Sequence, residues 1–198
     1  MLRLLSYCAS LALFFLIVLI AVITYGVARI NITIPDYSQL ADYEPPVTTR
    51  FFAGDGQVMM EYAAEKRLFV PVEKIPDLVK NAFIAAEDKH FYQHSGLDYK
   101  GIIRAVLGNL KNMGTGKRPA GASTITQQVA KNFLLSSELS YTRKIKEAIL
   151  ARRINKAYSK EHVLELYLNE IYLGNRAYGV AAAALNYFGK ALDELSLE

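Results

Sequence analysis

The sequence contains one cysteine and three histidines in 198 residues. A single cysteine cannot form a disulfide within the chain or supply a Cys-rich metal site. Cys8 also lies in a long apolar run, where a thiol is typically inert packing. The histidines His90, His94 and His162 lack the spacing of zinc ligands. The sequence therefore predicts neither a disulfide framework nor a zinc site, and the identity of any bound metal stays unknown.

Acidic residues are scarce between Gly101 and Lys160, where twelve lysines and arginines accompany only Glu138 and Glu147. The net charge of the whole chain is just +4, so positive charge is concentrated in this segment. There is no zinc-finger, RRM or basic-zipper pattern, which argues against nucleic acid as the partner. We expect phosphate on a lipid to meet this segment, with a solvated basic face as the alternative.

The composition, 52% hydrophobic and 21% charged, predicts one sizeable core plus an anchor. No charged residue occurs from Leu4 to Ala28, and a run of this length can cross a bilayer as a helix. A cleavable signal peptide is the alternative, since Gly26-Val27-Ala28 resembles a cleavage site, but the apolar run is longer than the apolar h-region of a usual signal peptide. Arg3 favours an N-terminus on the inner, cytoplasmic side of the membrane, although Arg29 at the other end of the run weakens this argument.

The composition changes along the chain in a way that predicts four parts. Residues 1–30 are expected to form a cytoplasmic tip and a transmembrane helix, and residues 31–47, with three prolines, a connector. Residues 48–75 contain two strand-like runs on either side of Gly54-Asp55-Gly56, which predicts a β-hairpin. A further strand-like piece, Arg67–Val72, is expected to join this hairpin.

Residues 76–198 are expected to form a helical domain, because apolar residues recur there at helical spacing. The last residues resemble a new helix start at Ser196, so we expect the domain to be truncated at its C-terminal end. Thr124 and Gln127 have the spacing of a capping box. The expected helices are the run after Pro76 that ends near Glu87, then Asp98–Asn112, Thr124–Leu135, Thr142–Tyr158, Glu161–Leu173 and Arg176–Phe188.

Three groups of polar residues are candidates for chemistry. Glu87 follows the apolar face of a helix, and a carboxylate held beside apolar neighbours becomes a stronger base; a solvated acidic pair with Asp88 is the alternative. Glu147 lies one helical turn after Arg143, which by itself indicates a surface ion pair. Residues 121–132 place hydroxyls and amides at a helix start, where free backbone N–H groups favour anions, although an ordinary well-capped helix has the same pattern.

These residues belong to four motifs, which are Glu87-Asp88-x-x-Phe91-x-x-His94-x-Gly96, Gly121-x-Ser123-Thr124-Ile125-Thr126-Gln127-Gln128-x-x-Lys131-Asn132, Arg143-Lys144-x-x-Glu147 and Leu164-Glu165-Leu166-Tyr167-Leu168-Asn169. Taken together, the motifs resemble those of the peptidoglycan glycosyltransferase family, and they occur in the family's order. The anchor and the hairpin resemble the N-terminal part of class A penicillin-binding proteins. Neither Ser-x-x-Lys nor Lys-Thr-Gly occurs, so penicillin binding is not expected of this chain.

The resemblance implies a mostly α, lysozyme-like glycosyltransferase domain with a small β-hairpin and one N-terminal transmembrane helix, located at a bacterial inner membrane. Its implied partners are lipid II, the growing lipid-linked glycan, the membrane and other cell-wall synthesis proteins. No cofactor is expected to be obligatory, and a divalent cation, Mg or Mn, is compatible with a diphosphate substrate. The implied catalytic residues are Glu87 and Glu147, and the implied substrate-binding residues are Asp88, Phe91, His94, Arg104, Ser123, Thr124, Gln127, Gln128, Lys131, Asn132, Arg143 and Lys144.

The chemistry of the residues agrees with this resemblance. A diphosphate-linked sugar leaves as a stable anion, so its transfer needs one base and several cations rather than an acid for a poor leaving group. Two alternatives remain: a lysozyme-like enzyme that cleaves peptidoglycan, which would not need the basic helix or the anchor, and a catalytically silent membrane-tethered scaffold. Missing motif residues would indicate the scaffold, and none is missing from the motifs.

Overall fold

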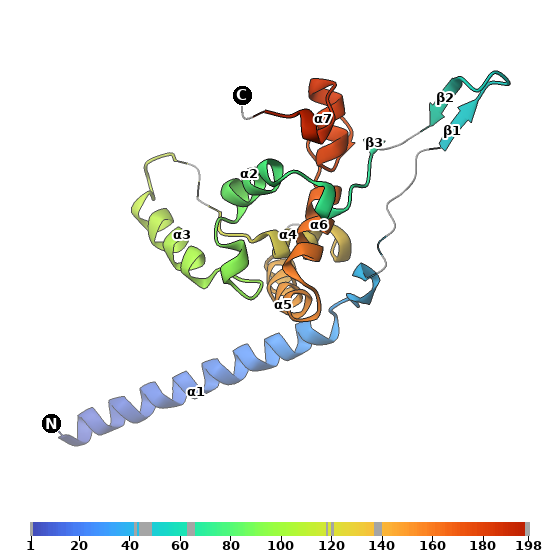
Figure 1. The fold of residues 1–198 in the computed structure, drawn as a ribbon. Coiled ribbons are helices and arrows are strands. Elements are labelled where there is room, and N and C mark those ends of the chain that lie inside the picture. Colours follow the sequence, from blue (N-terminus) through green and yellow to red (C-terminus); the bar gives the residue numbers. More distant parts are fainter. Residues whose placement is uncertain are drawn as a thin grey trace.

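The computed structural model describes residues 2–41, 43, 49–62, 66–117, 119, 121–136 and 140–196. These residues form seven α-helices, one hairpin and one short pair of parallel strands, so the prediction of a mostly α fold with a small hairpin is confirmed (Figure 1). The helices are α1 Leu2–Ile32, α2 Asp77–Glu87, α3 Tyr99–Lys111, α4 Ile125–Leu134, α5 Tyr141–Ala157, α6 Lys160–Glu170 and α7 Val180–Phe188.

Helix α4 is the centre of the domain and packs against α5 and α6. Its side chains Ile125, Val129 and Ala130 are almost completely buried, and they join one core with residues of α5, α6 and α7. The helix starts where the capping box predicts, because Thr124 Oγ1 accepts from the Gln127 N–H at 3.2 Å and the Gln127 side chain accepts from the Thr124 N–H at 3.0 Å. The polar start of α4 is thus fixed by its own sequence and by a buried setting.

The predicted hairpin forms from β1, Thr49–Phe52, and β2, Val58–Tyr62, which pair in antiparallel register. The expectation that Arg67–Val72 joins this hairpin is wrong. Strand β3, Lys66–Arg67, instead pairs in parallel with β4, Ala177–Tyr178. The guanidinium of Arg67 forms an ion pair with Glu170 and lies 4.3 Å from the centre of the Tyr178 ring, and these contacts hold β3 to the C-terminal part of the domain.

Two predicted helix boundaries are also wrong. Helix α6 ends at Glu170 rather than Leu173, and α7 begins at Val180 rather than Arg176. The intervening residues form a turn and β4, and this turn needs glycine at position 179. Gly179 has φ +80°, and a Cβ atom there would lie 2.7 Å from the carbonyl oxygen of Asn169. A close backbone approach of this kind has no helical periodicity to reveal it.

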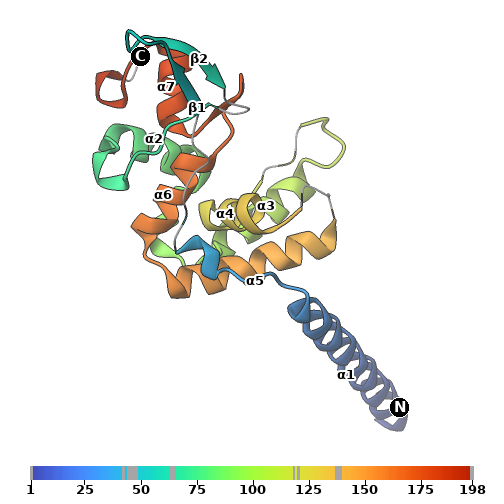
Figure 2. The same ribbon diagram turned by 90° about the vertical axis from the view of Figure 1, so that its right-hand side faces the viewer.

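Helix α1 extends away from the helical body in both views (Figures 1 and 2). Its segment from Ser10 to Ile32 is long and apolar enough to cross a membrane. The end of α1 and the residues that follow it contact α5: Arg153 donates to Asn31 Oδ1 at 2.7 Å, and Lys146 Nζ donates to the Thr33 carbonyl at 3.1 Å. Leu40 is fully buried. The end of the apolar helix is therefore joined to the helix that carries Arg143 and Glu147.

Helix α3 forms over the predicted range, but its apolar stripe faces outward. Ile103, Val106, Leu107 and Leu110 are each 53–62% exposed. The sequence also suggested Phe133, Leu134 and Leu135 as a shallow membrane contact, with core packing as the alternative. These three side chains are partly buried against the core, so core packing is the correct interpretation.

Candidate active site

Glu87 is the last residue of α2, and the helix stops there because Asp88 leaves the helical conformation, with φ −155° and ψ 70°. Its side chain is exposed, so the expected enclosure by apolar neighbours is wrong. The Gln128 amide, on α4, donates to Glu87 Oε2 at 2.8 Å. Burial raises the pKa of the Tyr167 hydroxyl, and the negative charge of Glu87 raises it further. Glu87 thus accepts a hydrogen bond from Gln128, and it lies close enough to the buried Tyr167 hydroxyl to raise the pKa of that group.

Asp88 joins the end of α2 to the start of α4. Its carboxylate is almost completely buried; it accepts from the Ile125 N–H at 3.1 Å, and both its oxygens lie 3.0 Å from His94 Nε2. A second link comes from Thr124, whose hydroxyl donates to the Gly96 carbonyl at 2.7 Å. These bonds fix Glu87 relative to α4. The site is therefore positioned by buried contacts of Asp88, His94 and Thr124.

Glu147 on α5 is 1% exposed, which is very low for a carboxylate. Arg143 Nε lies 3.1 Å from its Oε1, and Lys144 Nζ lies 2.6 Å from its Oε2. Lys144 Nζ also donates to Ser123 Oγ at 2.8 Å. The interpretation of Arg143 and Glu147 as a surface ion pair is therefore wrong, because the carboxylate is buried and holds two cations side by side.

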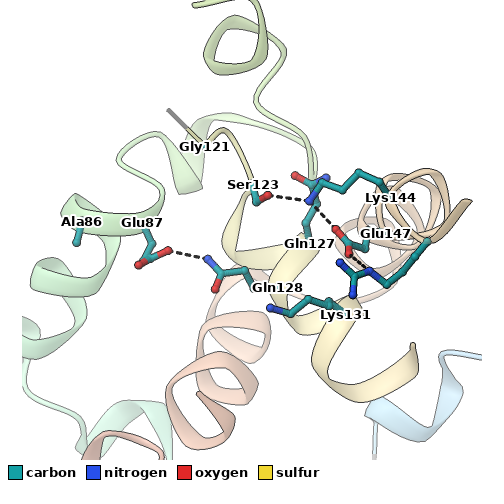
Figure 3. A pocket seen from close by; sticks show the side chains of 10 residues that line it. Ala86, Glu87, Gly121, Ser123, Gln127, Gln128, Lys131, Lys144 and Glu147 are labelled. Atoms are coloured by element: carbon teal, nitrogen blue, oxygen red, sulfur yellow. Dashed lines mark hydrogen bonds and ion pairs between the residues drawn. The ribbon is translucent and has the colours of Figure 1, made fainter. Parts of the chain in front are cut away.

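Glu87 and these cations line one cleft of about 470 Å³. Figure 3 shows Glu87 on one side, Lys144 and Glu147 on the other, and Gln128 and Lys131 between them. Ala86 and Gly121 complete the lining. Neither was predicted as a catalytic or binding residue, although Gly121 begins one of the matching motifs. The full lining is Ala86, Glu87, Gly121, Ser123, Gln127, Gln128, Lys131, Arg143, Lys144 and Glu147.

Six of the predicted site residues do not line this cleft: Asp88, Phe91, His94, Thr124, Asn132 and Arg104. Asn132 on α4 and Arg104 on α3 are exposed. Phe91 is fully buried. The predicted residues outside the lining are thus of two kinds, buried side chains and exposed ones. The other predicted residues, eight in number, are brought together: Glu87, Ser123, Gln127, Gln128, Lys131, Arg143, Lys144 and Glu147.

The sequence profile of a family described as Transglycosylase matches residues 55–198 of this chain. The chain belongs to the transglycosylase family. All the cleft-lining residues lie within the matched range, so the family's own domain supplies the whole site. The match confirms the resemblance to peptidoglycan glycosyltransferases.

Curated relatives of this transglycosylase chain include penicillin-binding protein 1A of Rickettsia felis, 50% identical over 193 residues, and of Rickettsia bellii, 52% identical over 189 residues. Penicillin-binding protein 1A of Neisseria flavescens is 48% identical over 180 residues. These matches cover 98%, 94% and 87% of this chain but only 24%, 24% and 22% of the relatives. The chain therefore corresponds to the glycosyltransferase part of a class A penicillin-binding protein and spans about a quarter of the relatives' length.

The buried ion pairs of the transglycosylase site predict a stability effect. We expect Glu147→Gln to lower the free energy of unfolding by about 1–3 kcal/mol, because the amide leaves Arg143 and Lys144 side by side without a neutralising charge. Chemical denaturation measures this change. Glu73→Gln, at an exposed position in a 3₁₀ turn, is the matched control and should have no effect. Equal stability of the two variants would contradict the buried role of Glu147.

Proposed function

We propose that the cleft polymerises lipid II into glycan strands, by transfer of a glycosyl group from a lipid-diphosphate donor to the 4-hydroxyl of an acceptor sugar. One observation carries this proposal: a single exposed carboxylate, Glu87, lines the same cleft as the cations of Lys131, Arg143 and Lys144. Cations of this kind bind diphosphate oxygens, and Glu87 is free to accept a proton from a sugar hydroxyl.

In the proposed reaction, Glu87 takes the proton of the acceptor's 4-hydroxyl while that oxygen attacks the anomeric carbon of the donor. The new carbon–oxygen bond forms on the face opposite the diphosphate, so the anomeric configuration inverts. The bond between the anomeric carbon and the diphosphate oxygen breaks, and its electrons leave with the lipid diphosphate. Lys131, Arg143 and Lys144 stabilise the charge that develops on this leaving group, and Glu147 holds the last two cations in place.

We propose that a divalent cation, Mg or Mn, is not obligatory for this chemistry. Among the residues that the structure describes, no three Asp, Glu, His or Cys side chains come together as a metal site. Glu147 is already paired with two cations. A divalent ion would therefore be held mainly by diphosphate oxygens, with Glu87 or Glu147 as the protein's contribution, and it would supply extra stabilisation of the leaving group.

A polymerisation assay on the purified chain, with lipid II in detergent, tests the proposed function. We expect glycan polymers that carry a lipid diphosphate at one end. The lysozyme-like alternative predicts release of soluble fragments from purified peptidoglycan and no polymer from lipid II. The silent scaffold predicts neither product from a chain that is folded by circular dichroism.

We propose that α1 anchors the chain in the membrane with its N-terminus inside, and that α3 rests on the outer surface of the same bilayer. The exposed apolar face of α3 suits contact with acyl chains, because such a face in water is unfavourable. In Figure 1 α3 lies on the side of the helical body toward which α1 extends. This arrangement holds the cleft close to the lipid-linked substrates.

A chain that begins at Asn31 tests the value of the anchor. Both substrates are lipid-linked, so an enzyme held at the bilayer searches a surface at a raised effective concentration. We expect the truncated chain to keep its polymerisation rate in detergent within about twofold, and to lose about tenfold or more in liposomes that carry lipid II. Equal rates of the two chains in liposomes would show that the anchor does not contribute to turnover.

The contribution of α3 can be separated in the same truncated chain. Leu107→Ser combined with Leu110→Ser exchanges two exposed apolar side chains for polar ones, so the fold should be retained. We expect the remaining binding to liposomes, measured by flotation, to fall further. Unchanged flotation would contradict the proposed contact of α3 with the bilayer.

A further inference from the structure

Lys160, the first residue of α6, has a buried ammonium group outside the cleft. Its Nζ has no hydrogen-bond partner among the residues that the structure describes, and it lies 4.4 Å from the centre of the Phe91 ring. A lysine rarely buries its charge without a partner, because loss of hydration is costly. A cation–π contact with one ring offsets only part of that cost. Stability alone therefore does not explain a lysine at position 160.

The electrostatic setting of Lys160 points to the same conclusion. Burial lowers the pKa of its ammonium to about 8, although the charges of Asp88 and Glu161 act in the opposite direction. Glu161 lies on the same helix, whereas Asp88 faces Lys160 from the end of α2 and is itself paired with His94. The ammonium thus remains mostly charged at neutral pH, at a position where its charge is disfavoured.

The residues that Lys160 faces belong to the segment that supports the cleft. Phe91 is fully buried and lies three residues after Asp88, which accepts the Ile125 N–H at the start of α4. Three residues further along α4, Gln128 donates to Glu87. Lys160 therefore contacts Phe91, which lies in the segment that aligns the proposed base with α4.

We propose that Lys160 is a positioning residue for glycosyl transfer: its ammonium, lodged over Phe91 and facing Asp88, holds residues 88–96 against α6 so that Glu87 and Gln128 keep their alignment. It touches no substrate and acts through Phe91 and Asp88. This inference rests on the proposed function, since it concerns the same reaction.

The test compares stability and activity of Lys160→Met, which keeps the length of the side chain and removes the charge. We expect polymerisation of lipid II to fall at least about tenfold, while the melting temperature at pH 7 stays equal or rises, because an unfavourable buried charge is gone. Lys156→Met, at an exposed position of α5, is the matched control and should change neither quantity. A merely structural lysine would lose stability and activity together.

The dependence on pH gives a second readout. Lys160 releases its proton near pH 8 when folded and near its ordinary value of 10.5 when unfolded, so the unfolded chain binds more protons between these values. Between these two pH values, Lys160 therefore makes the free energy of unfolding of the wild type rise as the pH rises. Lys160→Met should lack this rise. Wild-type activity should fall as the pH rises through about 8, where the variant shows no such step.

Full activity of Lys160→Met, or a loss of activity matched by a loss of melting temperature, would overturn this inference. A wild type without polymerase activity at every pH would overturn the proposed function itself, and the inference with it. The two failures are distinguished by the wild-type assay alone.

Discussion

Glu87→Gln is expected to lower lipid II polymerisation by about 10²–10⁴-fold, because the amide keeps the shape of the side chain and cannot accept the proton of the sugar hydroxyl. The amide can still pair with Gln128, so the cleft should keep its geometry. The initial rate of polymer formation from lipid II, at saturating substrate, measures the effect. The loss should appear in kcat, because the carboxylate accepts a proton in the transition state and does not contribute to substrate binding.

The control for this variant is Glu73→Gln, which neutralises an exposed carboxylate outside the cleft. It should retain the wild-type rate. Both variants should melt at the wild-type temperature, because each carboxylate is exposed and contributes little to stability. A Glu87→Gln rate above a few per cent of the wild type would remove Glu87 from the role of base.

Local sequence patterns predicted most helices of the domain and the hairpin. The capping box placed the start of α4, because the Thr124 hydroxyl accepts a backbone N–H that the first turn leaves free. Helix α3 was also predicted correctly as an element. The exposure of its apolar stripe was not predicted, because such a stripe has the same spacing whether it is buried or exposed.

The features that were missed depend on contacts between distant parts of the chain. Strand β3 pairs with β4 across more than one hundred residues, and no local pattern encodes that choice. The burial of Glu147 is likewise set by the packing of α4 on α5, so the spacing of Arg143 and Glu147 alone indicated a surface pair. The sequence did not single out Lys160, because its contact with Phe91 joins residues that lie far apart along the chain.

Lys131→Ala is expected to lower kcat/KM for lipid II by about 10²–10³-fold, the effect typical of removing one group that stabilises developing charge. Arg143 and Lys144 are both paired with Glu147, whereas Lys131 forms no ion pair with any carboxylate that the structure describes. The charge of Lys131 is therefore available to the diphosphate, and removing it should lower the rate of the reaction more than the stability of the fold.

Stability should separate Lys131 from its two cationic neighbours. Alanine is a good helix former and Lys131 supports no buried charge, so the free energy of unfolding of Lys131→Ala should stay within about 0.5 kcal/mol of the wild type. Thermal denaturation beside the rate assay provides the comparison, with Lys156→Ala, exposed on α5, as the matched control that should keep full activity. If Lys131→Ala lost stability in proportion to activity, Lys131 would be a structural residue of α4, and diphosphate binding would rest on Arg143 and Lys144 alone.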